Sequence, residues 1–116
     1  MIKIIPKCHK EIKSQEKNKK GISKAIKTRL KDFDKLKLIN PIILSYKKWQ
    51  VYKISCTSIY GAYRIIVAEN KVENKLVCDF YFKSEKQDLT SKEEKEIKVF
   101  LENCCDNSFF ASLDNF

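Results

Sequence analysis

Residues 49–83 read WQVYKISCTSIYGAYRIIVAENKVENKLVCDFYFK, and this stretch decides the fold. Three segments in it are rich in β-branched and aromatic residues, a composition typical of strands. They are residues 49–56, 62–69 and 75–83. The links between them are short: 57–61 contains a glycine, and 70–74 is polar and charged. The stretch therefore predicts two hairpins that join three consecutive antiparallel strands into a meander.

The residues before the meander predict one short strand and two helices. Residues 1–5 suit a strand that stops at Pro6, because proline has no N–H to give to a sheet ladder. The polar segment from Lys7 to about Lys20 predicts a helix, and Gly21 interrupts it. A second, core helix is predicted to follow and to end at Asn40-Pro41, because apolar residues recur there at three- and four-residue steps. This stripe consists of Ile22, Ala25, Ile26, Leu30, Phe33 and Leu36.

The residues after the meander predict a last helix. Thr90-Ser91 resembles a helix N-cap, and the acidic residues Glu93 and Glu94 favour a helix start. Ile97, Phe100 and Leu101 give this helix a packing stripe. The predicted fold is α+β, with a small antiparallel sheet of about four strands in the order β-α-α-β-β-β-α. Residues 1–103 are expected to form a single domain, and residues 104–116 a tail that docks on it or orders with a partner.

The charge of the chain is polarised. The net charge is +9, with 22 lysines but only two arginines, Arg29 and Arg64. Residues 1–53 hold 16 Lys and Arg against 4 Asp and Glu, whereas residues 54–116 hold 8 against 11. A basic surface of this kind predicts a polyanionic partner, nucleic acid or an anionic membrane surface, and an unevenly solvated surface is the alternative interpretation.

Cysteine usage and hydropathy indicate a compartment. The five cysteines form an odd number with no C-x-x-C pair, which favours reduced thiols in a cytoplasm. The start MIKIIPKCHK lacks the long apolar stretch of a secretory leader. No apolar run approaches the ~18 residues of a membrane span. We therefore expect a cytoplasmic chain with no membrane partner.

Two ordered motifs stand in the meander and after it. They are Gly61-Ala62-Tyr63-Arg64-Ile65-Ile66 and Lys83-Ser84-Glu85-Lys86-Gln87-Asp88-Leu89. Together they resemble the RelE/ParE superfamily of bacterial type II toxins, and within it the RelE and HigB-like mRNA interferases. Members show G-x-Y-R before two aliphatic residues, and then K-[SN]-E-x-x-[DN]-L leading into the last helix. The likeness spans roughly residues 49–101, while the first half is similar in layout only.

The resemblance implies a toxin of a type II toxin–antitoxin system, a ribosome-dependent mRNA endoribonuclease that inhibits translation. Such toxins cleave RNA by attack of the ribose 2′-hydroxyl on the adjacent phosphate, using lysine, arginine and tyrosine without metal or cofactor. The implied partners are a cognate antitoxin, the ribosome and mRNA, with no small-molecule cofactor.

The candidate catalytic residues are expected on one face of the sheet. Period-two alternation along the strands can place Lys53, Arg64, Tyr81 and Lys83 together. Arg64 is the foremost candidate, as a clamp on the phosphate oxygens, since a guanidinium forks onto two of them. Lys53 matches a catalytic lysine of the interferases, and Tyr81, Lys83 or Lys86 could supply further charge or acidity.

The chain departs from RelE at three positions. Ser55 stands where RelE carries a second strand lysine. The arginine and tyrosine that RelE places near the start of the last helix fall close to Ser84 and Thr90. The catalytic set is therefore incomplete by RelE standards, which leaves room for a ParE-like DNA gyrase inhibitor or a non-toxic basic nucleic-acid-binding domain.

Further lysines are candidates for contact with RNA. Lys47 and Lys48 lie beside Tyr46 and Trp49, so they could form an aromatic and basic surface for bases. The helical lysines could anchor the chain on rRNA irrespective of sequence, or meet an acidic antitoxin. Those in question are Lys20, Lys24, Lys27 and Lys31.

Overall fold

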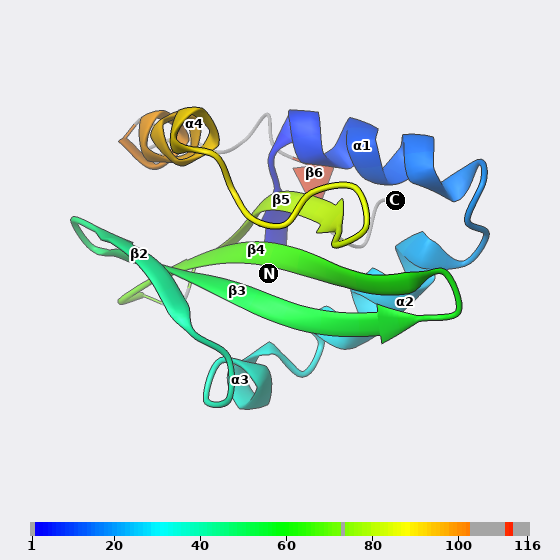
Figure 1. Cartoon of the computed structure of the whole chain (residues 1–116). Coiled ribbons are helices and arrows are strands. Elements are labelled where there is room, and N and C mark those ends of the chain that lie inside the picture. Colours follow the sequence, from blue (N-terminus) through cyan, green and yellow to red (C-terminus); the bar gives the residue numbers. More distant parts are fainter. Residues whose placement is uncertain (1, 73, 103–110, 113–116) are drawn as a thin grey trace.

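A computed structural model of the chain describes residues 2–72, 74–102 and 111–112. Its centre is one sheet with the strand order β2-β3-β4-β5-β1-β6 (Figure 1). The strands are β1 (Ile2–Ile4), β2 (Ile42–Tyr46), β3 (Trp49–Ser58), β4 (Gly61–Asn70), β5 (Lys75–Phe82) and β6 (Ala111–Ser112). The helices are α1 (Pro6–Glu16), α2 (Ile22–Leu30), α3 (Phe33–Leu36) and α4 (Ser91–Glu102).

The predicted meander is confirmed. β3 pairs antiparallel with β4 from Trp49 opposite Asn70 to Ser58 opposite Gly61, and β4 pairs antiparallel with β5. Gly61 adopts a φ of 113° at the tight β3–β4 turn, a backbone conformation that L side chains rarely adopt. The sequence placed all three strands to within two residues of their observed bounds.

The fold is α+β as expected, but the prediction of an antiparallel sheet of about four strands was wrong. The described sheet has six strands, and β1 runs parallel to β5. β2 was missed because its five residues directly follow Pro41 and show no alternation of exposed and buried positions. The two-residue β6 falls in the predicted tail and pairs with β1, whereas the rest of the segment 104–116 lies outside the described residues.

The predicted core helix is in fact two helices. α2 ends at Leu30, and α3 begins at Phe33 after a tight turn in which the Asp32 N–H donates to the Arg29 carbonyl. The reason lies in the stripe: its last steps, Leu30 to Phe33 to Leu36, are three residues long. A 3₁₀-like turn keeps such a repeat on one face, while a continued α-helix would rotate it away. All three of these side chains are buried.

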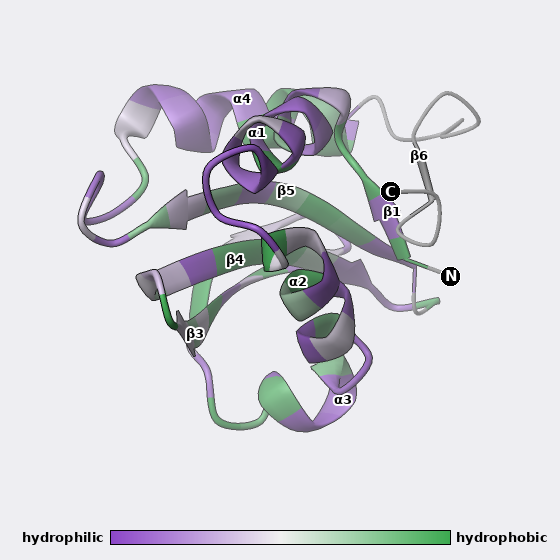
Figure 2. Cartoon of the chain, turned by 90° about the vertical axis from the view of Figure 1, so that its right-hand side faces the viewer, coloured by the Kyte–Doolittle hydropathy of each residue, from purple (hydrophilic) through white to green (hydrophobic). Residues whose placement is uncertain are grey.

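The helices lie on two sides of a twisted sheet. In Figures 1 and 2, α1 and α4 lie above strands β3–β5 and α3 lies below them, while α2 lies behind the right-hand end of β3 and β4 in Figure 1. The α4 N-terminus has the predicted cap, because Thr90 and Glu93 exchange hydrogen bonds between side chain and backbone N–H at 2.9 and 3.1 Å. Among the helices described, none is long and apolar enough to span a membrane.

The register gives the sheet two unlike faces. One, here called the apolar face, is fully buried and contains Tyr52, Ile54, Cys56, Tyr63, Ile65, Phe80 and Phe82. The other, here called the polar face, carries Lys53, Ser55, Arg64, Asp79 and Tyr81. A register shift between Ile66 and Val67 leaves Cys78 unpaired against β4 and reverses the alternation in β5. Unbroken alternation along β5 would put Val77 on the face of Asp79 and Tyr81, but the shift places it opposite Val67 on the apolar face.

Candidate functional site

Three residues form a row across the polar face. Ser55 of β3 is directly opposite Arg64 of β4, and Arg64 is directly opposite Tyr81 of β5. Lys53 belongs to the neighbouring row, opposite Ile66, and is therefore a diagonal neighbour of Arg64. Diagonal neighbours of this kind lie about 7–8 Å apart at their backbones, within reach of long side chains. The expected common face of Lys53, Arg64 and Tyr81 is thus present.

Tyr81 is the buried member of the row. Its side chain is only 6% exposed, and its hydroxyl finds no hydrogen-bond partner in the described part of the chain. Burial is the main cause that raises the pKa of Tyr81 to about 12, with the negative charge of Asp88 as the next. The phenol therefore keeps its proton at neutral pH and can act as a donor.

Lys53 approaches the loop that leads into α4. Its Nζ lies 3.8 Å from Oδ2 of Asp88, and its side chain is about one-quarter exposed. The Asp88 side chain is 63% exposed, so this carboxylate faces solvent beside the row. The loop, residues 83–90, runs in front of the sheet between β5 and α4 in Figure 1. The second motif of the sequence thus reaches the same face as the first.

Lys86 is held by two carboxylates. Its Nζ lies 3.3 Å from Oδ2 of Asp79 and also contacts Oε2 of Glu93, and it stands 4.7 Å above the Tyr81 ring. Burial acts to lower the pKa of Lys86, but the hydrogen bond to Glu93 and the charge of Asp79 outweigh it and raise the pKa. This ammonium stays charged and fixes the loop against β5 behind Tyr81.

Lys83 stands apart from this cluster. It lies in the turn directly after β5, where its backbone N–H donates to the Ala62 carbonyl at 3.0 Å. Its side chain is exposed, and no ion pair joins it to the other members within the described ranges. Of the five candidate catalytic residues, four lie in or next to the row, and Lys83 lies outside it.

A pocket of about 350 Å³ opens beside Tyr81, between α1, β5 and α4. Asp79, Tyr81, Lys86 and Glu93 line it, and the buried Cys8 and Cys78 lie at its apolar side. Burial keeps the pKa of the Cys8 thiol well above its usual value, so this thiol stays protonated. The chemistry of the pocket therefore comes from its tyrosine and charged groups.

A groove of about 330 Å³ flanks the other end of the row. Arg29, Ser55, Thr57 and Arg64 line it together with Cys56 and Ala62. Arg29 comes from α2 and donates from Nη2 to the Ser55 carbonyl at 3.3 Å. Sequence reasoning missed Arg29. Its signal is composition, since it is one of only two arginines in a chain with 22 lysines.

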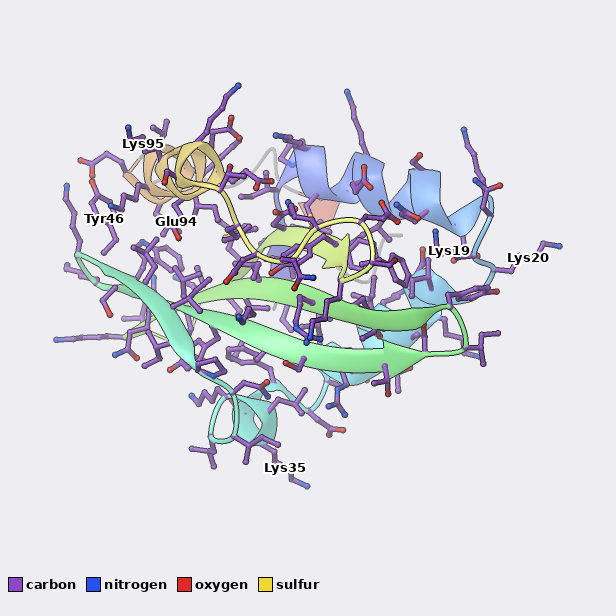
Figure 3. All side chains as sticks on the ribbon, viewed as in Figure 1. Lys19, Lys20, Lys35, Tyr46, Glu94 and Lys95 are labelled. Carbon is purple, nitrogen blue, oxygen red and sulfur yellow. The ribbon has the colours of Figure 1, made fainter. Side chains whose placement is uncertain are left out.

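The lysines predicted to contact RNA fall into three separate groups. Lys47 and Lys48 form the turn between β2 and β3, and Lys47 is paired with Glu102 of α4. Lys20 lies near the β3–β4 turn, since its carbonyl accepts the Tyr60 hydroxyl at 2.7 Å, and it points away from the sheet in Figure 3. The third group lines a hollow on one flank of α2 and consists of Lys24, Lys27 and Lys31. None of the three groups lines the pocket beside Tyr81 or the groove at Arg64.

A comparison of the chain with models of protein families, with curated proteins and with solved structures finds no match in any of the three.

The arrangement suits the chemistry of a phosphodiester. A guanidinium, an ammonium and a protonated phenol share one face, and an accessible carboxylate stands at its border. Cations stabilise the charge that builds on phosphoryl oxygens, a proton donor serves the leaving oxygen, and a carboxylate can accept a proton. The site therefore contains each kind of group that metal-free cleavage of RNA requires.

Proposed function

We propose that this chain is a RelE-like toxin, a ribosome-dependent endoribonuclease that cleaves mRNA at the polar face and thereby stops translation. The observation that carries the proposal is the row itself: Arg64 lies opposite Tyr81, whose buried hydroxyl lacks a partner, and Lys53 lies diagonal to Arg64. A buried donor without a partner costs about 1–3 kcal/mol, so the unsatisfied Tyr81 hydroxyl favours a role with a ligand.

The proposed reaction is an internal transfer. The ribose 2′-oxygen attacks the adjacent phosphorus while the bond from phosphorus to the 5′-oxygen breaks, which leaves a 2′,3′-cyclic phosphate and a 5′-hydroxyl. Arg64 and Lys53 balance the charge on the phosphoryl oxygens. Asp88 accepts the proton of the 2′-hydroxyl, because it is the exposed carboxylate beside the row, while Asp79 and Glu93 are held by Lys86. Tyr81, whose hydroxyl is buried in the free chain, donates its proton to the departing 5′-oxygen after the RNA displaces the side chains that cover it.

The order of elements supports the same proposal. A short strand, a helical pair, a three-stranded meander and a last helix follow one another in the described chain, with α3, β2 and β6 as additions. This is the layout expected for the RelE-like toxins. The basic first half of the chain would serve to hold it on ribosomal RNA, and a cognate antitoxin would neutralise it.

The test is induced expression in a bacterial host, with a purified translation system as the second measurement. We expect translation to stop and mRNA to be cut in ribosomal register. Arg64→Ala should remove both effects while the circular dichroism spectrum of the chain is retained. DNA damage signalling and filamentation in place of mRNA cuts would instead identify a ParE-like gyrase inhibitor, and harmless expression a non-toxic nucleic-acid-binding domain.

A further inference from the structure

We infer that Arg29 and Arg64 together form a phosphate subsite for single-stranded RNA in the groove at the outer edge of β3. This inference rests on the proposed function for its ligand and adds a residue, Arg29, that no motif singled out. The two guanidinium groups come from opposite sides of the sheet, Arg29 from α2 and Arg64 from the polar face of β4. They line one groove with the hydroxyl-bearing Ser55 and Thr57.

The edge of β3 is open where the groove lies. β2 pairs with β3 only from Trp49 to Tyr52, so among the described residues no strand lies along the outer side of the rest of β3. Chain from the α3–β2 link covers part of it, because the Asn40 side chain accepts the Ser55 N–H at 3.0 Å. Beyond this contact the exposed Ser55 and Thr57 border the groove, which leaves room for an extended ligand along the strand.

Both arginines keep donors for a ligand. Each donates a hydrogen bond to a backbone carbonyl, Arg29 to Ser55 at 3.3 Å and Arg64 to Tyr63 at 3.0 Å, and Arg29 also bonds with the Cys56 thiol. A guanidinium has five N–H donors in a planar fork, so most of them remain for phosphate oxygens. Burial raises the pKa of the Cys56 thiol, and both arginines oppose this rise. The positive fields of the two side chains therefore converge on the same point of the groove.

In the described part of the chain, the groove of Arg29 and Arg64 has no carboxylate. No Asp or Glu lines the groove, and within residues 2–72 and 74–102 neither arginine has a carboxylate at ion-pair distance. Lysines elsewhere behave differently, as the pairs of Lys37 with Glu69 and of Lys86 with Asp79 show. The two arginines of this lysine-rich chain therefore lie where one external anion can reach both guanidinium groups.

The position along β3 favours an RNA backbone over an acidic peptide. Lys53, Ser55 and Thr57 follow one another on the polar side of β3, so the groove lies next to the diagonal pair of Lys53 and Arg64. A nucleic-acid strand that lies along β3 would place the scissile phosphate between Lys53 and Arg64, and the next phosphate in the groove between Arg64 and Arg29. A polyanion fits this linear order of cations, and RNA is favoured over an acidic peptide because the groove continues the site proposed to cleave a phosphodiester.

The experiment uses the fact that the chain has two arginines. A ¹⁵N–¹H spectrum of the folded chain therefore shows two Nε–H signals, which Arg29→Lys and Arg64→Lys assign. The probe is a tetrauridylate with 2′-O-methyl groups, which binds but offers no attacking hydroxyl. We expect both signals to shift with one common midpoint, and the same oligomer with uncharged methylphosphonate links to shift neither.

The salt dependence of binding supplies the second measurement. Arg29→Gln should reduce the slope of log affinity against log salt by about 0.7, the contribution of one phosphate contact to a single strand. Lys35→Gln removes the same charge from α3, where Lys35 points away from the sheet in Figure 3, and should leave the slope unchanged. Arg29→Lys keeps the charge but loses the fork, so affinity should fall while the slope is retained.

Three results would overturn the subsite: movement of only one arginine signal, movement of neither, or equal movement of both with a tetraglutamate peptide. These outcomes are separate from those of the proposed function. If the chain stops translation but its two arginine signals do not shift, the subsite alone is disproved. If both arginine signals shift with RNA but mRNA stays intact, the nuclease activity is disproved and the subsite stands.

Discussion

Arg64 lies directly opposite Tyr81 on neighbouring antiparallel strands, and the Tyr81 hydroxyl beside it is buried with no partner in the described part of the chain. A hydroxyl in this state destabilises the fold unless something outside the chain uses it. Removal of the Tyr81 hydroxyl therefore distinguishes two roles. If the hydroxyl serves stability, its loss should lower the free energy of unfolding; if it serves catalysis, its loss should lower the cleavage rate without destabilising the fold.

Tyr81→Phe should leave the free energy of unfolding unchanged or raise it by about 1 kcal/mol, because it removes only the unpaired buried hydroxyl. Cleavage of mRNA in a translating system should fall at least about a hundredfold, the usual contribution of a general acid. Urea denaturation and a primer-extension assay of mRNA cuts measure the two effects. A variant that is less stable and cleaves normally would show that the hydroxyl serves only the core.

Asp88→Asn should strengthen RNA binding and weaken cleavage at once. The change removes a negative charge 3.8 Å from Lys53, so the cation becomes available to phosphate, yet it also removes the proposed proton acceptor. We expect a lower dissociation constant for the methylated tetrauridylate together with a lower rate of mRNA cleavage. Asp32→Asn is the matched control, since Asp32 is an exposed acid in the α2–α3 turn. Faster cleavage by Asp88→Asn would assign the proton transfer to another group.

Thr90→Ala should destabilise the chain by about 1 kcal/mol, because it removes the side-chain acceptor for the Glu93 N–H at the start of α4. The loop that carries Asp88 ends at this cap, so the loss should also reduce the protection of loop amides from hydrogen exchange. Ser91→Ala changes the next hydroxyl residue and is the control. Equal losses of unfolding free energy in the two variants would show that the hydrogen bond to the Thr90 side chain does not stabilise α4.

The sequence predicted the meander and the common face of Lys53, Arg64 and Tyr81 because both follow from alternation within single strands. The features that it missed depend on contacts between distant segments. The bulge at Cys78 reverses the alternation in β5, and no local pattern marks it. Arg29 reaches the groove only because α2 packs beside the edge of β3, which the spacing of its own helix cannot reveal. Lys86 was expected as a further cation of the site, yet two carboxylates, one of them 14 residues from the other, hold it in place.

Lys86→Met should cause a loss of stability that depends on pH. The change leaves Asp79 and Glu93 partly buried without their common cation, so the free energy of unfolding at pH 7 should fall by about 1–3 kcal/mol. Burial already raises the pKa of Asp79 and Lys86 opposes this rise, while the pKa of Glu93 is lowered, against the effect of burial, chiefly by its hydrogen bond from Lys86. Without Lys86 both folded-state pKa values rise, and a carboxyl with a raised folded-state pKa stabilises the fold when protonated and loses this stability as the pH rises.

The deficit of Lys86→Met relative to the original chain should therefore be largest near pH 7 and shrink as the pH falls through the range in which the two carboxyls take up protons. Urea denaturation at pH 7 and pH 4 measures this difference. Lys83→Met removes an exposed lysine three residues earlier in the same turn and should show a small effect at both pH values. An equal deficit at the two pH values would mean that Lys86 acts through the contact of its ammonium with the Tyr81 ring, since that contact does not titrate in this range.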